Sequence, residues 1–206
     1  MNWQIELRRV GKEYNERPVL QDISASVTAP GVWTILGPNG SGKSTLLKII
    51  AGLLTPTEGE VVYLHNGERL NAQQRRQVVG MVAPDIALYR PLTAIENLRF
   101  FARARGVRVQ DGDLLSLLEQ VHLRSRAHDP VATFSTGMVQ RLKVLTALVH
   151  RPPVLLLDEP GSNLDEAGME FIRHTVRVQA EHGIVIVATN DTRELDYGEP
   201  LIQLGA

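Results

Sequence analysis

Residues 37–45 read Gly-Pro-Asn-Gly-Ser-Gly-Lys-Ser-Thr, in which four residues separate a glycine from a Gly-Lys-Ser triplet. Glycines at this spacing let backbone N–H groups converge on phosphate oxygens, and a helix that starts at Ser44 adds partial positive charge. Lys43 would contact the β- and γ-phosphates of a nucleotide, and the Ser44 hydroxyl would ligate Mg²⁺. The pattern predicts a phosphate-binding loop that consists of Gly37, Pro38, Asn39, Gly40, Ser41, Gly42, Lys43, Ser44 and Thr45.

Two adjacent acids, Asp158 and Glu159, end the apolar run VLLLDEP. In a parallel sheet the carboxyl ends of the strands form the edge where ligands bind, so these acids are expected beside the phosphate loop. Asp158 would hold the Mg²⁺ shell through water, and Glu159 would polarise an attacking water. Asp, Glu and Pro are also common in simple turns. Together with the phosphate loop, the pair favours a reactive site.

Four apolar runs, residues 32–36, 78–82, 154–158 and 184–189, are typical of strands that are covered on both faces of a parallel sheet. Period-two patterns near the N-terminus, in WQIELRRV and VLQDISASV, predict half-exposed antiparallel strands. Helical patterns cover residues 44–50, 94–105, 113–121, 137–149 and 166–180. Three of these helices follow one another between residues 93 and 150 with no strand between them, which predicts an all-helical insert.

Composition narrows the function classes. The chain of 206 residues suits one domain, and its 22 basic against 23 acidic residues make nucleic acid an unexpected partner. There is no cysteine, which excludes disulfides and thiolate metal sites. No stretch has the apolar core of a signal peptide or the roughly 18 consecutive apolar residues of a membrane span. A role at a membrane would therefore require a partner.

The spacing of these motifs resembles that of ATP-binding-cassette (ABC) ATPases, and three further segments add to the resemblance. Phe134 to Met138 resembles the family's Leu-Ser-Gly-Gly-Gln signature at a helix start, and SNLD resembles its D-loop. Tyr14 lies where the family stacks an aromatic ring on adenine. The resemblance assigns Ser135, Thr136, Gly137 and Met138 to the signature, and Ser162, Asn163, Leu164 and Asp165 to the D-loop.

The resemblance covers the whole chain and implies an α/β fold. The expected fold is a P-loop NTPase with a mainly parallel sheet flanked by helices, an N-terminal antiparallel β subdomain and an inserted α-helical subdomain. Residues 1–206 would form one ABC ATPase domain. Its RecA-like core would comprise about residues 1–92 and 151–206, and its helical subdomain about residues 93–150.

The signature has a physical reason of its own. Ser135 at a helix N-terminus, with Gly137 close behind, would offer a hydroxyl and free N–H groups to an anion, although an ordinary Ser N-cap gives the same pattern. The resemblance implies that this segment completes the site of another subunit, so that two chains enclose two ATP molecules. The other subunit would be a second copy or another ABC ATPase chain.

The same resemblance implies transport driven by ATP. Separate integral membrane subunits would carry the substrate, with this chain on the cytoplasmic face of the membrane. LTAIENLRFFARARG and MVQRLKVLTALVHRPPVLLLDEP look most similar to the small haem-exporter (cytochrome c maturation) ATPases. Partner helices are expected near the helical insert and the loop that contains Asp85.

Two positions depart from the family pattern. Where relatives place a glutamine that ligates Mg²⁺, the segment GMVAPDIALYRPLT has none. Asp85 is the nearest polar candidate for that place, and Pro84 is the other possible alignment. The alternative is that Asp85 is only an exposed turn residue. Asn190 replaces the usual histidine before Asp191, and it is expected to contact the γ-phosphate as a neutral donor and acceptor. Hydrolysis is therefore expected to be slower than in relatives with histidine.

Other functions remain as alternatives. A regulatory module that closes on ATP with little turnover would fit the two departures, whereas Glu159 argues against it. A soluble ABC ATPase that acts on DNA or ribosomes would carry long coiled-coil insertions or two tandem cassettes, and neither fits in 206 residues with balanced charge. A nucleotide kinase is disfavoured more strongly, because nothing in the sequence supplies an acceptor site and the signature would be unexplained.

Overall fold

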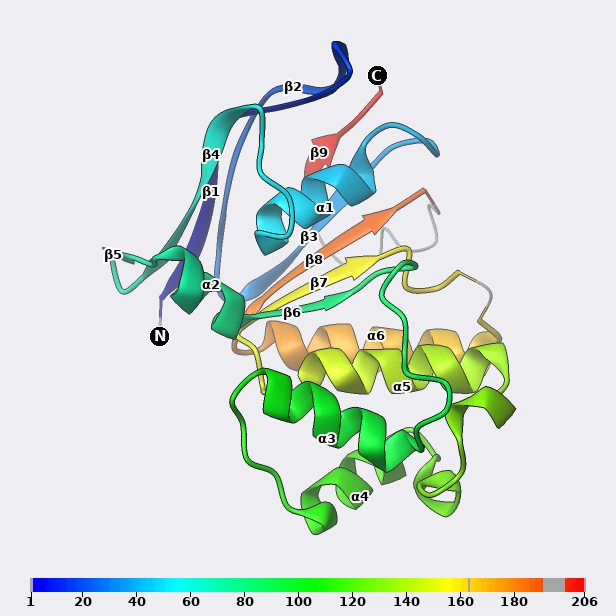
Figure 1. Cartoon of the computed structure of the whole chain (residues 1–206). Coiled ribbons are helices and arrows are strands. Elements are labelled where there is room, and N and C mark those ends of the chain that lie inside the picture. Colours follow the sequence, from blue (N-terminus) through cyan, green and yellow to red (C-terminus); the bar gives the residue numbers. More distant parts are fainter. Residues whose placement is uncertain (1, 163, 191–198, 206) are drawn as a thin grey trace.

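The computed structural model describes residues 2–162, 164–190 and 199–205. Figure 1 shows a parallel sheet between two helical layers, with helix α1 on one face and helices α5 and α6 on the other. A second, antiparallel sheet lies beside α1, and helices α3 and α4 extend the layer beneath α5. No helix in these residue ranges has the length and apolarity needed to cross a bilayer.

The parallel sheet has five strands within the described residues, in the order β6-β7-β8-β3-β9. Every pairing between neighbours is parallel. All residues of β6, β7 and β8 are buried, which explains why these segments are apolar throughout rather than alternating. The strands are β3 (Gly31–Leu36), β6 (Val79–Val82), β7 (Val154–Asp158), β8 (Ile184–Thr189) and β9 (Glu199–Gln203).

Helices pack on both faces of this sheet through apolar side chains. Helix α1 (Lys43–Ala51) buries Leu46 and Ile50 in a core shared with the antiparallel sheet. Helices α5 (Thr136–Leu148) and α6 (Glu166–Ala180) cover the opposite face, where Val144 and Ile172 pack against β7 and β8. The two-sided cover confirms the α/β layer arrangement expected from the sequence.

The helical insert consists of α3 (Ala94–Ala104), α4 (Asp111–Gln120), two short 3₁₀ turns (Arg124–Arg126 and Val131–Thr133) and the start of α5. It has a hydrophobic core of its own, to which all three helices contribute. The central side chains of this core are Leu98, Leu114, Leu118, Leu142 and Leu145. The insert is therefore a packed unit with its own core.

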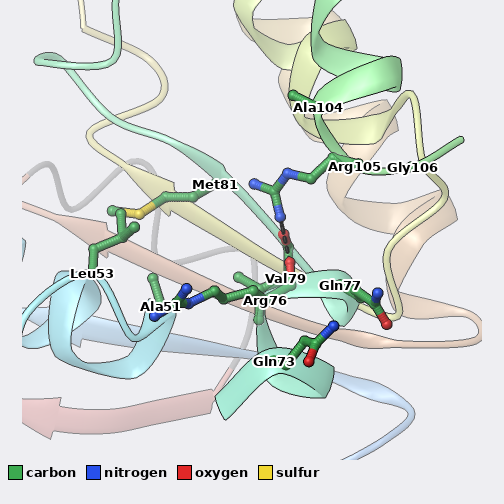
Figure 2. Close-up of a pocket in the computed structure, with 10 residues that line it drawn as sticks. All are labelled: Ala51, Leu53, Gln73, Arg76, Gln77, Val79, Met81, Ala104, Arg105 and Gly106. Atoms are coloured by element: carbon green, nitrogen blue, oxygen red, sulfur yellow. Dashed lines mark hydrogen bonds between the residues drawn. The ribbon is translucent and has the colours of Figure 1, made fainter.

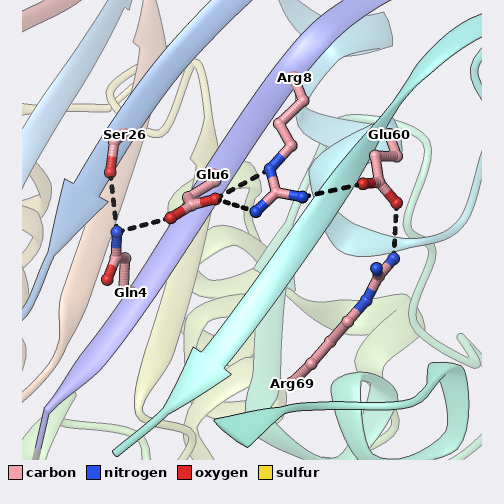
Figure 3. A network of polar contacts seen from close by, with 6 residues as sticks. All are labelled: Gln4, Glu6, Arg8, Ser26, Glu60 and Arg69. Carbon is pink, nitrogen blue, oxygen red and sulfur yellow. Dashed lines mark hydrogen bonds and ion pairs between the residues drawn. The ribbon is translucent and has the colours of Figure 1, made fainter. Parts of the chain in front are cut away.

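The antiparallel sheet has the order β2-β1-β4-β5, and its strands are β1 (Trp3–Tyr14), β2 (Arg17–Thr28), β4 (Glu58–His65) and β5 (Glu68–Arg69). The inner face of β1 buries Trp3, Ile5 and Leu7. Figure 3 shows the outer face, where Arg8 donates to Glu6 and Glu60 at 2.6 and 3.1 Å. Because these ion pairs are exposed, they contribute little to stability.

Several elements were not expected from the sequence. These are β4, β5, β9 and helix α2 (Ala72–Val78), which is held by a capping box between Asn71 and Gln74. The strand expected at 78–82 begins at Val79, because Val78 is the last residue of α2. Helix α4 begins at Asp111 rather than at residue 113, because Gln110 and Asp113 form a capping box. The other expected ends agree to within one residue, except for β1 and β2, which are longer.

The parallel strands β3, β7 and β8 bring three segments of the chain to one edge of the sheet. In the register of the sheet, Leu36 pairs with Thr189 and Asp158 pairs with Ala188, so β3, β7 and β8 end at nearly the same level. The phosphate loop follows β3, the two acids end β7, and Asn190 follows β8. The fold therefore gathers segments that are far apart in the sequence.

Candidate functional site

The phosphate loop ends where helix α1 begins, and Gly42 makes the junction. This residue has φ 98°, and a Cβ atom there would lie 2.9 Å from the Leu20 side chain, so glycine is required on both counts. No side chain caps α1. Since the first N–H groups of a helix have no partner within it, the start of α1 offers backbone donors to an anion.

Lys43 is buried at this junction, with only 4% of its surface exposed. Its ammonium group donates to the carbonyl oxygens of Gly37 at 2.8 Å and Pro38 at 3.1 Å. It also forms an ion pair with Glu159 Oε1 at 3.5 Å. The carbonyls and the acid thus hold the ammonium group inside the loop, where phosphate oxygens could replace them as partners.

Asp158 is an unusual buried carboxylate. It is 2% exposed, and neither of its oxygens makes a well-formed hydrogen bond within the described residues. Burial raises the pKa of Asp158, and the nearby Ser44 hydroxyl lowers it by a smaller amount. A buried carboxylate without a partner is costly unless a cation compensates it.

This cost gives a test of whether Mg²⁺ fits the site. Asp158 offers a hard anionic oxygen that makes no well-formed hydrogen bond within the described part of the chain, and Ser44 offers a hydroxyl beside it. These are the oxygen donors that Mg²⁺ prefers. The residues present therefore fit the ion, and Ser44 and Asp158 are the groups that would hold it.

A cavity of about 270 Å³ opens between the phosphate loop and the acids. Its walls are formed by Val19, Asn39, Gly40, Gly42, Lys43, Ser44, Thr45, Pro84, Asp158 and Glu159. Val19 on β2 is an ordinary apolar residue that no sequence motif marks, so only the tertiary structure shows that it lines the cavity. Pro84 occupies the place that faces the cavity from the loop after β6, so this loop supplies no polar side chain to the cavity wall.

Asn190 lies at the same edge of the sheet and contacts the phosphate loop directly. Its Nδ2 donates to Asn39 Oδ1 at 2.9 Å. This bond joins the end of β8 to a residue that lines the cavity. The structure thus brings Asn190 to the loop that the sequence assigns to phosphate binding. Asp191, the next residue, lies outside the described residues.

Tyr14 and Asp85, both predicted to act at the site, lie away from the cavity. The Tyr14 side chain is exposed, and the Lys12 ammonium lies 5.2 Å from its ring centroid. Asp85 is also exposed, and it forms an ion pair with Lys48 at 2.6 Å instead of facing the phosphate loop. Of the two alternatives for the missing glutamine, Pro84 is the one at the cavity.

The signature segment lies apart from this cavity, at the start of α5. Ser135 is exposed and caps the helix, accepting a hydrogen bond from the Met138 N–H at 3.4 Å. Thr136 is exposed as well, and a Cβ atom at Gly137 would meet no atom of the described residues within 4 Å. Packing within the chain therefore does not require glycine at position 137.

The expected D-loop connects the acids to α6. Asp165 caps that helix by accepting from the Gly168 N–H at 2.8 Å, and Leu164 packs against the core beneath the sheet. The Ser162 N–H donates to the Glu159 carbonyl at 3.1 Å, which closes a turn. Asn163 lies outside the described residues.

The sequence profile of the ABC transporter family matches residues 20–162. The chain is 36% identical over 194 residues to the Bacillus subtilis ABC transporter ATP-binding protein YdbJ, and 33% identical over 195 residues to the linearmycin resistance ATP-binding protein LnrL of the same organism. These alignments cover 93% and 92% of this chain, but the chain spans only 63% and 62% of the two relatives.

A solved structure agrees with these matches. An ATP-binding cassette, in a dimeric post-hydrolysis state bound to ADP and phosphate, is 25% identical and superposes with a TM-score of 0.84 over 98% of this chain and 97% of that one. The chain therefore belongs to the ABC transporter family, and its fold is that of an ABC ATPase cassette. The fold predicted from the sequence is confirmed.

Proposed function

We propose that this chain binds and hydrolyses ATP as the energy-coupling subunit of an ABC transporter. The observation that carries the proposal is the convergence of Lys43, Asp158 and Glu159 on one cavity beside the phosphate loop. Family membership supports the same reading. Tyr14 would have to approach the loop to stack on adenine, so that role stays a prediction.

The residues of the cavity suggest how hydrolysis would proceed. Phosphate oxygens would replace the carbonyls of Gly37 and Pro38 as partners of the Lys43 ammonium. This change would also separate the ammonium group from the Glu159 carboxylate. The Glu159 carboxylate would then accept a proton from a water molecule while the oxygen of that water bonds to the γ-phosphorus. The bond between the γ-phosphorus and the bridging oxygen breaks, and ADP leaves. Mg²⁺ held by Ser44 and Asp158 would supply positive charge to the phosphate oxygens.

A second copy, or another ABC ATPase chain, would complete each site. Ser135, Thr136, Gly137 and Met138 lie at a helix start that is partly exposed, and the described residues leave open the space where a Cβ atom of Gly137 would lie. A small residue with space around it suits close contact with a group from outside the chain. In a two-fold dimer each chain contributes one phosphate loop and one signature, so ATP would hold the two halves together.

The variant Glu159→Gln tests hydrolysis and dimerisation together. It removes the proton acceptor but keeps the shape of the side chain, so turnover should fall by about 10²–10⁴-fold while ATP still binds. The expected result is an ATP-bound dimer in size-exclusion chromatography that wild-type protein forms only transiently. Turnover close to wild type would remove Glu159 from the mechanism, and a monomer at saturating ATP would contradict the two-chain site.

A regulatory module with little turnover is the second candidate. It is favoured by Pro84, which offers the cavity no polar group, and by Asn190, which cannot carry a proton near neutral pH. A steady-state ATPase assay decides between the two functions. Turnover that depends on Glu159 supports the transporter ATPase, whereas nucleotide binding without measurable turnover supports the module.

The membrane partner would dock between the core and the helical insert. Figure 2 shows a cavity there, about 390 Å³ in volume, between the end of α1, helix α2 and the end of α3. Leu53 is 65% exposed at its wall, and Arg105 crosses its floor to donate to the Val79 carbonyl at 3.0 Å. Arg76 adds positive charge. A membrane-subunit helix with an apolar face and an acidic residue would fit.

The variant Leu53→Asp tests this docking site. The membrane protein used is a polytopic one whose gene neighbours the gene of this chain, and the two are co-expressed. A charge in the apolar wall should prevent the variant chain from co-purifying with that membrane protein. ATP binding by the isolated chain should not change, because Leu53 does not line the nucleotide cavity. Unchanged co-purification would place the partner elsewhere, and Leu53→Met serves as the apolar control.

The transported substrate is proposed at the level of class only. Similarity to haem-exporter ATPases, expected from the sequence, remains a prediction, whereas the relatives include proteins named for linearmycin resistance and lantibiotic transport. Specificity would reside in the membrane subunits. The chain would act at the cytoplasmic face of the membrane through those subunits.

A further inference from the structure

The loop after β6, residues 83–93, connects the wall of the nucleotide cavity with the helical insert. Pro84 lines the cavity, whereas the next residue, Asp85, has a side chain that is 61% exposed. The Ile86 N–H donates to the Ala83 carbonyl at 3.2 Å and closes a tight turn. Two adjacent residues of one turn thus contact different parts of the protein.

A lysine of the core holds Asp85 from one side. Lys48 Nζ lies 2.6 Å from Asp85 Oδ2, and the Lys48 side chain is one-third exposed. Lys48 lies on α1, five residues after Lys43, in the helix that begins in the phosphate loop. The hydrogen bond from Lys48 lowers the pKa of Asp85, so the acid stays ionised at neutral pH.

A lysine of the signature helix holds the same turn from the other side. Lys143 is half-buried on α5, and its ammonium donates to the Pro84 carbonyl at 3.2 Å. Burial lowers the pKa of Lys143, and the charge of Asp85 raises it. The loop is therefore fixed by one cation from α1 and one from α5.

We propose that Asp85 is a positioning residue: its carboxylate, paired with Lys48, acts with the neighbouring Pro84 carbonyl, bonded to Lys143, to fix the orientation of the helical insert relative to the phosphate-loop helix. Asp85, Lys48 and Lys143 are together named the Asp85 clasp. The clasp gives Asp85 a role other than the metal ligand that the sequence suggested. To reach a cation in the nucleotide cavity, Asp85 would have to leave Lys48.

The clasp can be tested without ATP hydrolysis, because the chain contains no cysteine and accepts labels at chosen sites. Cysteines placed at exposed Gln120 on the insert and exposed Val178 on α6 can carry spin labels. With Asp85→Asn, the population outside the main label-to-label distance should rise roughly two- to fivefold, as expected for an exposed ion pair. Asp85→Glu keeps the charge and should keep the wild-type distribution.

The matched control is Asp111→Asn. Asp111 pairs with Arg99 at 2.7 Å, and its side chain is 65% exposed, close to the value for Asp85. Both partners of this pair belong to the insert, so its loss should leave the distance distribution unchanged. Broadening by the control equal to that of Asp85→Asn would contradict the proposal.

Two other outcomes would also overturn the clasp. One is an unchanged distance distribution in Asp85→Asn. The other is a rise of about tenfold or more in the Mg²⁺ concentration needed for half-maximal binding of a fluorescent ATP analogue, the effect of losing a group that supports a metal. An unchanged Mg²⁺ requirement supports the clasp. Since the distance measurement needs no turnover, its result is separate from the fate of the proposed ATPase function.

Discussion

Two helix starts in this chain are candidate anion sites, and they differ in how much of a site one chain supplies. At the start of α1, a buried lysine, an acid and two loop carbonyls already surround the place for phosphate. At the start of α5, Ser135 is exposed and makes one capping bond at 3.4 Å. The first site is built within the chain, whereas the second offers donors to a group that another molecule must bring.

Mixing two inactive variants would show most directly whether this comparison is right. Lys43→Met should disable the phosphate loop, and Ser135→Arg should block the signature. In a mixed dimer one site keeps a native loop from one chain and a native signature from the other. An equal mixture should therefore recover up to about one quarter of wild-type ATP turnover, although each variant alone is inactive.

The control mixture combines Lys43→Met with Glu159→Gln. Both changes damage the half-site formed by the loop and the acids, so every site in a mixed dimer contains a defect and no turnover should return. Recovery in this control, or none in the first mixture, would mean that the two helix starts do not combine across chains.

A second experiment examines the buried charge of the first site. Without a metal, ionised Asp158 has no well-formed hydrogen bond within the described residues, and Ser44 and the charges of Lys48 and Lys43 offset the cost of its burial only in part. Asp158→Asn should therefore raise the free energy of unfolding by about 1–2 kcal/mol at neutral pH. Because burial raises the pKa of Asp158, the wild-type protein should lose stability as pH rises from the ordinary carboxyl range through the raised pKa. Chemical denaturation at several pH values measures both effects.

Addition of Mg²⁺ with a non-hydrolysable ATP analogue should reverse the order, because bound ligand stabilises only the folded state that holds it. Wild-type protein should then be the more stable of the two. A metal-free Asp158→Asn variant that is less stable than wild type would indicate a structural partner for Asp158 and would contradict its assignment to the metal.

The smallest expected effect concerns Asn190, which adds a contact from β8 to the phosphate loop. Asn190→Ala removes one neutral hydrogen bond to Asn39, so ATP turnover should fall by about three- to tenfold. Asn190→His should raise turnover and introduce a pH dependence near the pKa of histidine, about 6.5. Steady-state rates across pH measure both, and an alanine variant equal to wild type would exclude a catalytic part for Asn190.

Much of the fold could be predicted because local pattern and final burial agree. The runs at β7 and β8 are apolar throughout and lie in the middle of the sheet, where both faces are covered. Prediction failed for β4 and β9, which have weaker patterns. Four of the eight residues of β4 are partly buried, and within the described residues β9 pairs with β3 alone. Such strands depend on contacts with distant segments more than on their own sequence.

The candidate site could also be predicted where its geometry depends on residues that are adjacent in sequence. Gly42, Lys43 and Ser44 are adjacent in sequence, and the geometry of a strand, a turn and a helix fixes their relation. The sequence alone therefore determined the family and the form of this loop, whereas the binding of phosphate there stays a prediction. The direction of side chains in the loop after β6 depends on Lys48 and Lys143, which lie far away in sequence. Only the tertiary structure decided that Pro84 faces the cavity and Asp85 does not, because a turn is oriented by the elements that pack around it.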